Sequence, residues 1–212
     1  VVGGKGYVAA SIGPLEQMVE PLGPISFDEA IAYYKEWVDV VVNAGCDILL
    51  FETFSDIHEL KAAIIAAREL TSDIPIQAQL TYEAGRTTVS GTSPEVAAVT
   101  LAALDVQIIG TNCSTGPQHL IPVVENMYRR TDKFISVQPN AGMPELLQGE
   151  MTFSTSPQEM ARYVDQFIAA GANLIGGCCG TTPDHIRAMS AGIKKKRPKQ
   201  KLAQSLFRVS SR

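Results

Sequence analysis

The chain has 212 residues, of which 45% are hydrophobic and 19% charged, a balance typical of globular proteins that excludes a disordered chain. No stretch approaches 18 consecutive apolar residues, and the first residues show no apolar run behind a basic start, so we expect neither a membrane-spanning helix nor a signal peptide. The net charge of −4 comes from an acidic body, 1–193, and a basic end, 194–212; the acidic body argues against a nucleic-acid partner.

Short apolar runs recur along the chain and predict the strands of a sheet. Most are continuous rather than alternating, as is typical of parallel strands buried on both faces. The predicted strands are 7–12, 47–51, 74–81, 106–111, 133–138 and 173–177.

Helical segments with recognisable start signals separate these runs. Ser26 and Glu29 form a capping-box pattern, and Ser93 and Ser156 each precede a proline at the first helical position. The predicted helices are 26–43, 56–70, 93–104, 118–130, 156–171 and one from 182 into the basic end.

Six successive strand–helix units indicate an α/β protein, and the residues after the strands decide between an open sheet and a barrel. An open sheet would spread those residues over roughly 25 Å, since strands lie about 4.8 Å apart, whereas a barrel gathers them at one mouth. We therefore predict a (β/α)₈ TIM-type barrel, of which this chain supplies about six units. The polar or reactive residues that follow the strands are Glu52, Thr81, Cys113, Asn140, Cys178 and Cys179.

Three of the four cysteines follow predicted strands, and the adjacent pair makes a poor disulfide framework. We infer a reducing, cytoplasmic location. Cys113, Cys178 and Cys179 at one mouth would form a Cys₃ zinc site with an open fourth position. The residues alone leave three alternatives to a zinc site open. The cysteines could be small buried side chains, which is our interpretation of Cys46. Cys178 and Cys179 could instead form a redox-active disulfide, or the glycine-rich loop could bind phosphate.

Three segments carry a family resemblance. GTNCSTGP at 110–117, QPNAGMP at 138–144 and GGCCGTTPDHI at 176–186 resemble, in this order, the homocysteine S-methyltransferase family. Within it, LLFETFSDIHELKAAIIAARE and the ending RVSSR are most similar to the N-terminal homocysteine module of cobalamin-dependent methionine synthases. The family's Asp-Gly-x-x-Gly-Thr and Thr-Asn-Thr-Phe-like motifs, from its first two strands, are absent, so we expect a domain over 1–193 that lacks two N-terminal units, followed by a linker over 194–212.

The resemblance also implies roles for individual residues. Zinc ligands are Cys113, Cys178 and Cys179, and Glu52 helps to hold the amino group of homocysteine. Asn140 lies near the metal and fills its open position when substrate is absent, and Asn112 lines the same mouth.

The implied activity is methyl transfer to a homocysteine thiolate activated by zinc, which yields methionine. The donor is methylcobalamin, recharged from methyltetrahydrofolate on other modules of a full-length enzyme. The alternatives are a homocysteine methyltransferase that uses betaine or S-methylmethionine, or a non-catalytic module with a structural zinc.

Overall fold

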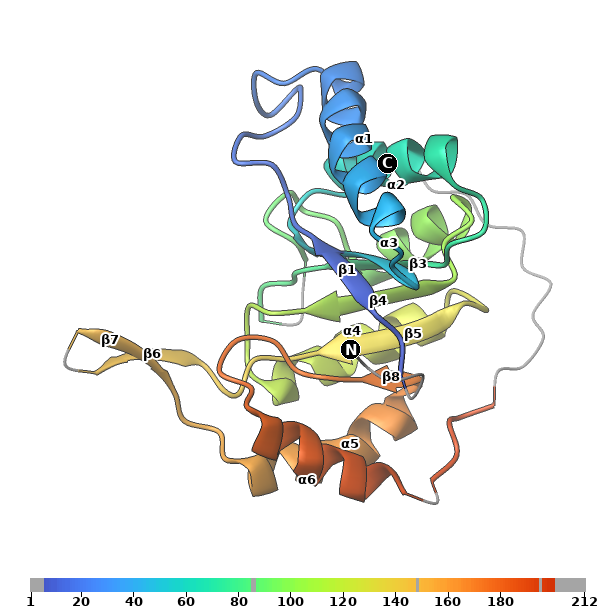
Figure 1. The fold of residues 1–212 in the computed structure, drawn as a ribbon. Helices are drawn as coiled ribbons and strands as arrows, with labels where there is room; N and C mark the ends of the chain where they lie inside the picture. Colours follow the sequence, from blue (N-terminus) through green and yellow to red (C-terminus); the bar gives the residue numbers. More distant parts are fainter. Residues whose placement is uncertain (1–5, 85–86, 148, 195, 201–212) are drawn as a thin grey trace.

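The computed structural model describes residues 6–84, 87–147, 149–194 and 196–200 (Figure 1). Six of its strands form one parallel sheet, in the order β1-β2-β3-β4-β5-β8. A separate antiparallel hairpin joins β6 and β7. The strand bounds are β1 Ala9–Ile12, β2 Ile48–Phe54, β3 Ile76–Leu80, β4 Ile108–Asn112, β5 Phe134–Gln138, β6 Pro144–Leu147, β7 Glu150–Phe153 and β8 Leu174–Ile175.

The sheet is a curled, incomplete barrel. Each strand pairs with the next large-sheet strand along the chain, so every connection within the sheet is a crossover between parallel neighbours. Among the described residues, β1 and β8 are the two edges and do not pair with each other. The expected fold class, a partial TIM-type barrel of six units, is confirmed.

The helices follow the strands in the expected places, and most begin at the residues that the sequence marked. The Ser26 and Ser156 capping boxes are both formed, and Asp56 and Ser93 accept from backbone amides of the helices they precede. None of the described helices is long and apolar enough to cross a membrane. The helix bounds are α1 Phe27–Asn43, α2 Ile57–Leu70, α3 Pro94–Ala102, α4 Pro117–Tyr128, α5 Pro157–Ala170 and α6 Pro183–Ile193.

The two faces of the sheet differ in chemistry. Alternate strand residues such as Phe51, Ile109 and Val137 are fully buried in the core between sheet and helices. The residues between them face the barrel interior, where Gln79 donates to the Ser136 hydroxyl at 2.9 Å. This two-residue alternation decides which side chains reach the mouth, because the polar set lies on the inner face.

The β6–β7 hairpin was not predicted. It separates β5 from α5 and extends away from the sheet (Figure 1). Its strands pair only with each other, and Leu146 on β6 is 69% exposed.

The first part of the basic end lies against the helices. Lys196 forms an ion pair with Asp165 of α5, and the Lys199 ammonium lies 4.7 Å from the ring centre of Tyr128 at the end of α4. The Tyr128 hydroxyl donates to the Gln200 carbonyl at 2.6 Å. The predicted linker over 194–212 extends beyond this contact into residues outside the described part of the chain.

Candidate metal centre

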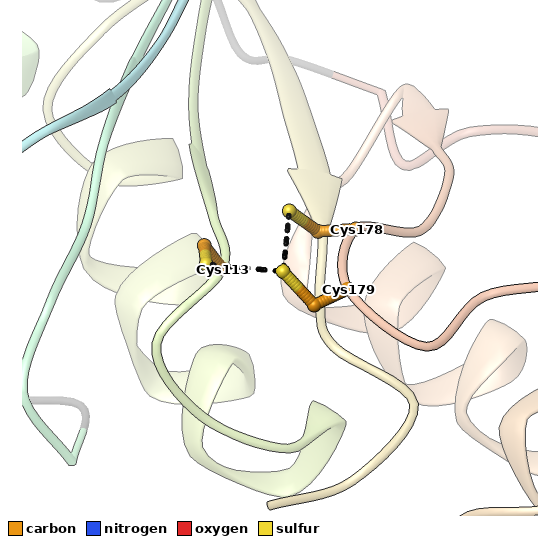
Figure 2. A group of neighbouring side chains, drawn as sticks. All are labelled: Cys113, Cys178 and Cys179. Carbon is orange, nitrogen blue, oxygen red and sulfur yellow. Dashed lines mark hydrogen bonds between the residues drawn. The ribbon is translucent and has the colours of Figure 1, made fainter. Parts of the chain in front are cut away.

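Three free cysteine thiols converge at the carboxyl ends of β4 and β8 (Figure 2). The Cys179 sulfur lies 3.9 Å from that of Cys113 and 4.0 Å from that of Cys178. All three sulfurs are within 4.8 Å of one another, although Cys113 is 65 or more residues away in the chain. The structure thus brings together the three cysteines that the sequence singled out and leaves Cys46 packed against the hydrophobic core.

Cys113 is presented by an unusual turn directly after β4. Cys113 and Ser114 have φ values of 60° and 59°, in the left-handed region that few non-glycine residues adopt. The Cys113 amide donates to the Gln138 carbonyl at 3.0 Å, and its carbonyl accepts from the Thr115 amide at 2.7 Å. Such strained conformations persist only where neighbours enforce them, and they cluster at functional sites.

The Cys178–Cys179 loop is held by the segment after β5. The Cys178 amide donates to the Pro139 carbonyl at 2.8 Å, and the Cys179 amide donates to the Asn140 side-chain oxygen at 3.1 Å. A Cβ on Gly177 would lie 2.2 Å from the Thr181 hydroxyl oxygen, so the tight turn requires glycine. Asn140, which is buried, therefore lies beside the cysteine loop and orients it.

The surroundings of the three thiols move their pKa values in opposite directions. Hydrogen bonds, first from the Cys178 thiol and then from the Ser114 amide, Cys179 and Asn140, outweigh burial and lower the pKa of Cys113 to about 5. The same hydrogen bond to Cys113, together with burial, raises the pKa of Cys178. Burial and the nearby Cys113 charge raise the pKa of Cys179. A thiolate is thus already present at neutral pH, as a metal ligand must be.

The geometry fits a zinc ion. Zinc–sulfur bonds of about 2.3 Å in a tetrahedral site place the sulfurs about 3.8 Å apart, close to the two distances of 3.9 and 4.0 Å. Soft thiolates favour zinc over magnesium or calcium, which prefer oxygen. Among the described residues, no other cluster of three or more potential ligands comes together.

The other interpretations of the cysteines fit less well. The 4.0 Å between the Cys178 and Cys179 sulfurs shows two thiols and no disulfide. A phosphate cradle needs free backbone amides, but in this loop the amides of Cys178, Cys179, Thr181 and Thr182 all donate within the protein.

A polar group lies beside the thiols at the ends of β2 and β4. The Glu52 carboxylate accepts from the Ser11 hydroxyl at 2.5 Å and lies 3.4 Å from the Asn112 amide nitrogen. That nitrogen is also 3.7 Å from the Cys178 sulfur, so Asn112 lies between the carboxylate and the three thiols. Asn112 is fully buried, whereas Glu52 is partly accessible. Glu52 and Asn112 thus both lie at the predicted mouth.

Ser11 and Thr53 belong to this group but were missed by the sequence analysis. Thr53 has a φ of 69°, donates its amide to the Asn112 side-chain oxygen, and accepts from the Asn112 side-chain nitrogen, both at 2.8 Å. Neither residue carries a local signal, because a serine and a threonine in strands are ordinary. Only the position of Thr53 beside Glu52 could have drawn attention to it.

His185 lies near the cysteine loop without reaching the thiols. Its Nδ1 accepts from the Thr182 amide at 3.1 Å, and its Nε2 contacts the Thr155 carbonyl at 2.9 Å. Because a carbonyl only accepts, Nε2 carries the proton. Both ring nitrogens are used in fixing the start of α6, so neither is directed at the three thiols.

Comparison with known proteins places these features in a family. The sequence model of the homocysteine S-methyltransferase family matches residues 2–193. Methionine synthase from Mycobacterium tuberculosis is 34% identical over 205 residues, covering 94% of this chain and 17% of that protein. Methionine synthase from Mycobacterium leprae is 34% identical over 196 residues, 90% of this chain and 16% of that protein. The chain thus spans about a sixth of these curated relatives.

Solved structures support the same family assignment. The homocysteine methyltransferase MmuM from Escherichia coli superposes in its apo form with a TM-score of 0.72 and 26% identity, over 88% of this chain and 63% of that chain. Its metallated form has the same TM-score and sequence identity, and the match covers 87% of this chain and 60% of that chain. The match of the family model to nearly the whole chain, together with these relatives, shows that the chain belongs to the homocysteine S-methyltransferase family.

Proposed function

We propose that this chain is the homocysteine-activating part of a zinc-dependent methyltransferase that forms methionine. The observation that carries the proposal is the convergence of three free thiols at the ends of β4 and β8, beside a carboxylate. Family membership and the names of the relatives, methionine synthase and homocysteine methyltransferase, supply the substrate.

Cys113, Cys178 and Cys179 would hold the zinc and leave one tetrahedral position for the substrate sulfur. When bound, zinc supplies a Lewis acid that keeps the homocysteine sulfur deprotonated, whereas a free thiol with a pKa of about 8.5 is only a few per cent thiolate at neutral pH. The thiol proton leaves on binding, so methyl transfer needs no general base. A sulfur lone pair forms the new S–CH₃ bond, and the leaving group departs with the electron pair of its bond to the methyl group.

The residues around the thiols would bind and orient the substrate. Glu52 offers a carboxylate to the homocysteine ammonium, and the Ser11 hydroxyl holds that carboxylate in place. Asn140 fixes the cysteine loop through the Cys179 amide. Its place beside Cys113 also suits it to fill the open metal position when substrate is absent.

For the methyl donor we propose methylcobalamin carried by another module of a longer protein and recharged from methyltetrahydrofolate. The support is that the curated relatives are methionine synthases and that their match to this chain occupies about a sixth of their length. The residues of the metal centre do not distinguish this donor from betaine or S-methylmethionine, because the nucleophile is the same for each.

Single substitutions of the thiols test the metal site. Replacement of Cys113, Cys178 or Cys179 by serine should abolish stoichiometric zinc binding after dialysis, since serine is a poor zinc ligand. Cys46→Ser is the matched control, because Cys46 packs against the core and should leave zinc content unchanged. If any of the three variants retains one zinc per chain, that cysteine is not a ligand. Zinc that binds but does not respond to homocysteine would indicate a structural site instead.

A further inference from the structure

We propose that Asn112 is a positioning residue that holds the carboxylate of Glu52 beside the metal centre by clamping Thr53 in a strained conformation. This inference rests on the proposed function, since it assigns to Glu52 the amino group of homocysteine. It departs from the expectation that Asn112 lines the mouth, because it gives Asn112 no contact with substrate.

Within β2, the backbone strain is localised at Thr53. Thr53 has a φ of 69°, and a β-branched residue with positive φ is a genuine outlier. The pairing of β2 with β3 is regular up to Phe51 and resumes, shifted, at Phe54. Glu52 and Thr53 therefore occupy an irregularity of the strand, and such bulges redirect side chains next to active sites.

Asn112 supplies the groups that hold this conformation. Its side-chain oxygen accepts from the Thr53 amide, and its nitrogen donates to the Thr53 hydroxyl, both at 2.8 Å. The backbone of Asn112 is itself fixed, since it pairs with Gln138 of β5 and its carbonyl accepts from the Thr81 hydroxyl at 3.1 Å. A rigid strand end thus imposes the strained conformation on a neighbouring strand.

The remaining hydrogen of the Asn112 amide is directed at the site. The nitrogen lies 3.4 Å from a Glu52 carboxylate oxygen and 3.7 Å from the Cys178 sulfur. An amide nitrogen carries two hydrogens, of which one is used on Thr53. Asn112 is also fully buried, which leaves it no accessible surface to offer a ligand. Of the two groups near this nitrogen, Glu52 is the one assigned to the homocysteine ammonium, so the effect of Asn112 on that group passes through Glu52.

The test measures binding of two thiols to the zinc-loaded chain. Homocysteine has the amino group that Glu52 would contact, and 4-mercaptobutanoate is the same molecule without it. Asn112→Ala should weaken homocysteine binding by about fivefold or more, because a displaced carboxylate loses part of a charge-assisted hydrogen bond. Binding of 4-mercaptobutanoate and the zinc content should stay unchanged. In a Glu52→Gln background, the added Asn112→Ala should cost clearly less than it costs the wild type, because only the weaker neutral hydrogen bond of the glutamine remains to be lost.

A second variant covers the possibility that Asn112→Ala fails to fold. Thr53→Val keeps the shape of an exposed side chain and removes only the hydroxyl that Asn112 contacts, so it should produce the same selective loss in weaker form. Thr152→Val, on the hairpin, is the matched control and should leave the binding of both thiols unchanged.

The outcomes separate this inference from the proposed function. Equal weakening of the binding of both thiols by Asn112→Ala or Thr53→Val would overturn the positioning role while leaving homocysteine binding by the wild-type chain intact. So would a loss from Asn112→Ala in the Glu52→Gln background that is as large as in the wild type. If the zinc-loaded wild-type chain binds neither thiol, the proposed function and this inference both fail.

Discussion

Replacement of Glu52 by glutamine removes one charge from the site and little else. The Ser11 hydroxyl and the Asn112 amide nitrogen are the groups that face the carboxylate, at 2.5 and 3.4 Å. A glutamine can satisfy both, because its oxygen accepts from Asn112 while its nitrogen donates to the Ser11 hydroxyl, which also accepts. We therefore expect Glu52→Gln to fold and to bind zinc as the wild type does.

The expected loss concerns the substrate ammonium alone. A hydrogen bond to a charged partner contributes about 1.5–3 kcal/mol and a neutral one about 0.5–1.5 kcal/mol, so the exchange should cost about 1–2 kcal/mol. That corresponds to a homocysteine affinity reduced by about 5- to 30-fold, at 1.4 kcal/mol for each factor of ten. The partial burial of Glu52 places the charge where solvent screens it incompletely.

Isothermal titration of the zinc-loaded chain with homocysteine and with 4-mercaptobutanoate measures the effect. The wild type should prefer homocysteine, and Glu52→Gln should bind the two thiols with more nearly equal affinity. Glu125→Gln, which removes an exposed carboxylate paired with Arg129, is the control for loss of charge. Loss of zinc from Glu52→Gln with unchanged homocysteine affinity would refute the assigned role.

Three further predictions concern the thiol charge and the fold. In the metal-free protein the pKa of Cys113 is lowered to about 5, so its alkylation rate should stay nearly constant from pH 8 to pH 6 and fall only as pH drops through about 5. Gly171→Ala should destabilise the protein by about 1–3 kcal/mol, because Gly171 has a φ of 114° and an added Cβ would lie 2.2 Å from the Tyr128 ring. Tyr34→Phe should cost about 1–3 kcal/mol by leaving buried Glu59 without the hydroxyl that donates to it at 2.7 Å.

Each of these three predictions can be measured directly. Mass spectrometry of alkylated peptides reports the Cys113 rate, and a tenfold decline per pH unit below 8 would show an ordinary thiol. Urea unfolding reports the two stability changes. Tyr33→Phe, on the exposed side of the same helix as Tyr34, should have no effect. An unchanged unfolding free energy for Gly171→Ala would contradict the steric reasoning.

The elements set by local chemistry were predictable. The helix start at Ser26 was predictable from a capping box and the one at Ser156 from the proline that follows it, because both signals lie within four residues of the helix start. The β6–β7 hairpin was not predicted, because its strands pair with each other outside the parallel sheet, and the buried apolar runs that mark the other strands belong to that sheet.

Part of the candidate site could also be predicted from the sequence. The convergence of Cys113 with Cys178 and Cys179 follows from the rule that parallel strands in a barrel present their carboxyl ends at one mouth. The conformation of Thr53 does not follow from any local rule, because it depends on Asn112, 59 residues further along the chain. Long-range hydrogen bonds of this kind leave no trace in a single sequence.

The most direct test of the account is X-ray absorption at the zinc edge of the loaded chain, recorded with and without homocysteine. We predict three sulfur ligands and one lighter ligand before addition, and four sulfurs at about 2.3 Å afterwards. A zinc shell that is unchanged by homocysteine would contradict the claim that Cys113, Cys178 and Cys179 hold a metal that binds the substrate sulfur.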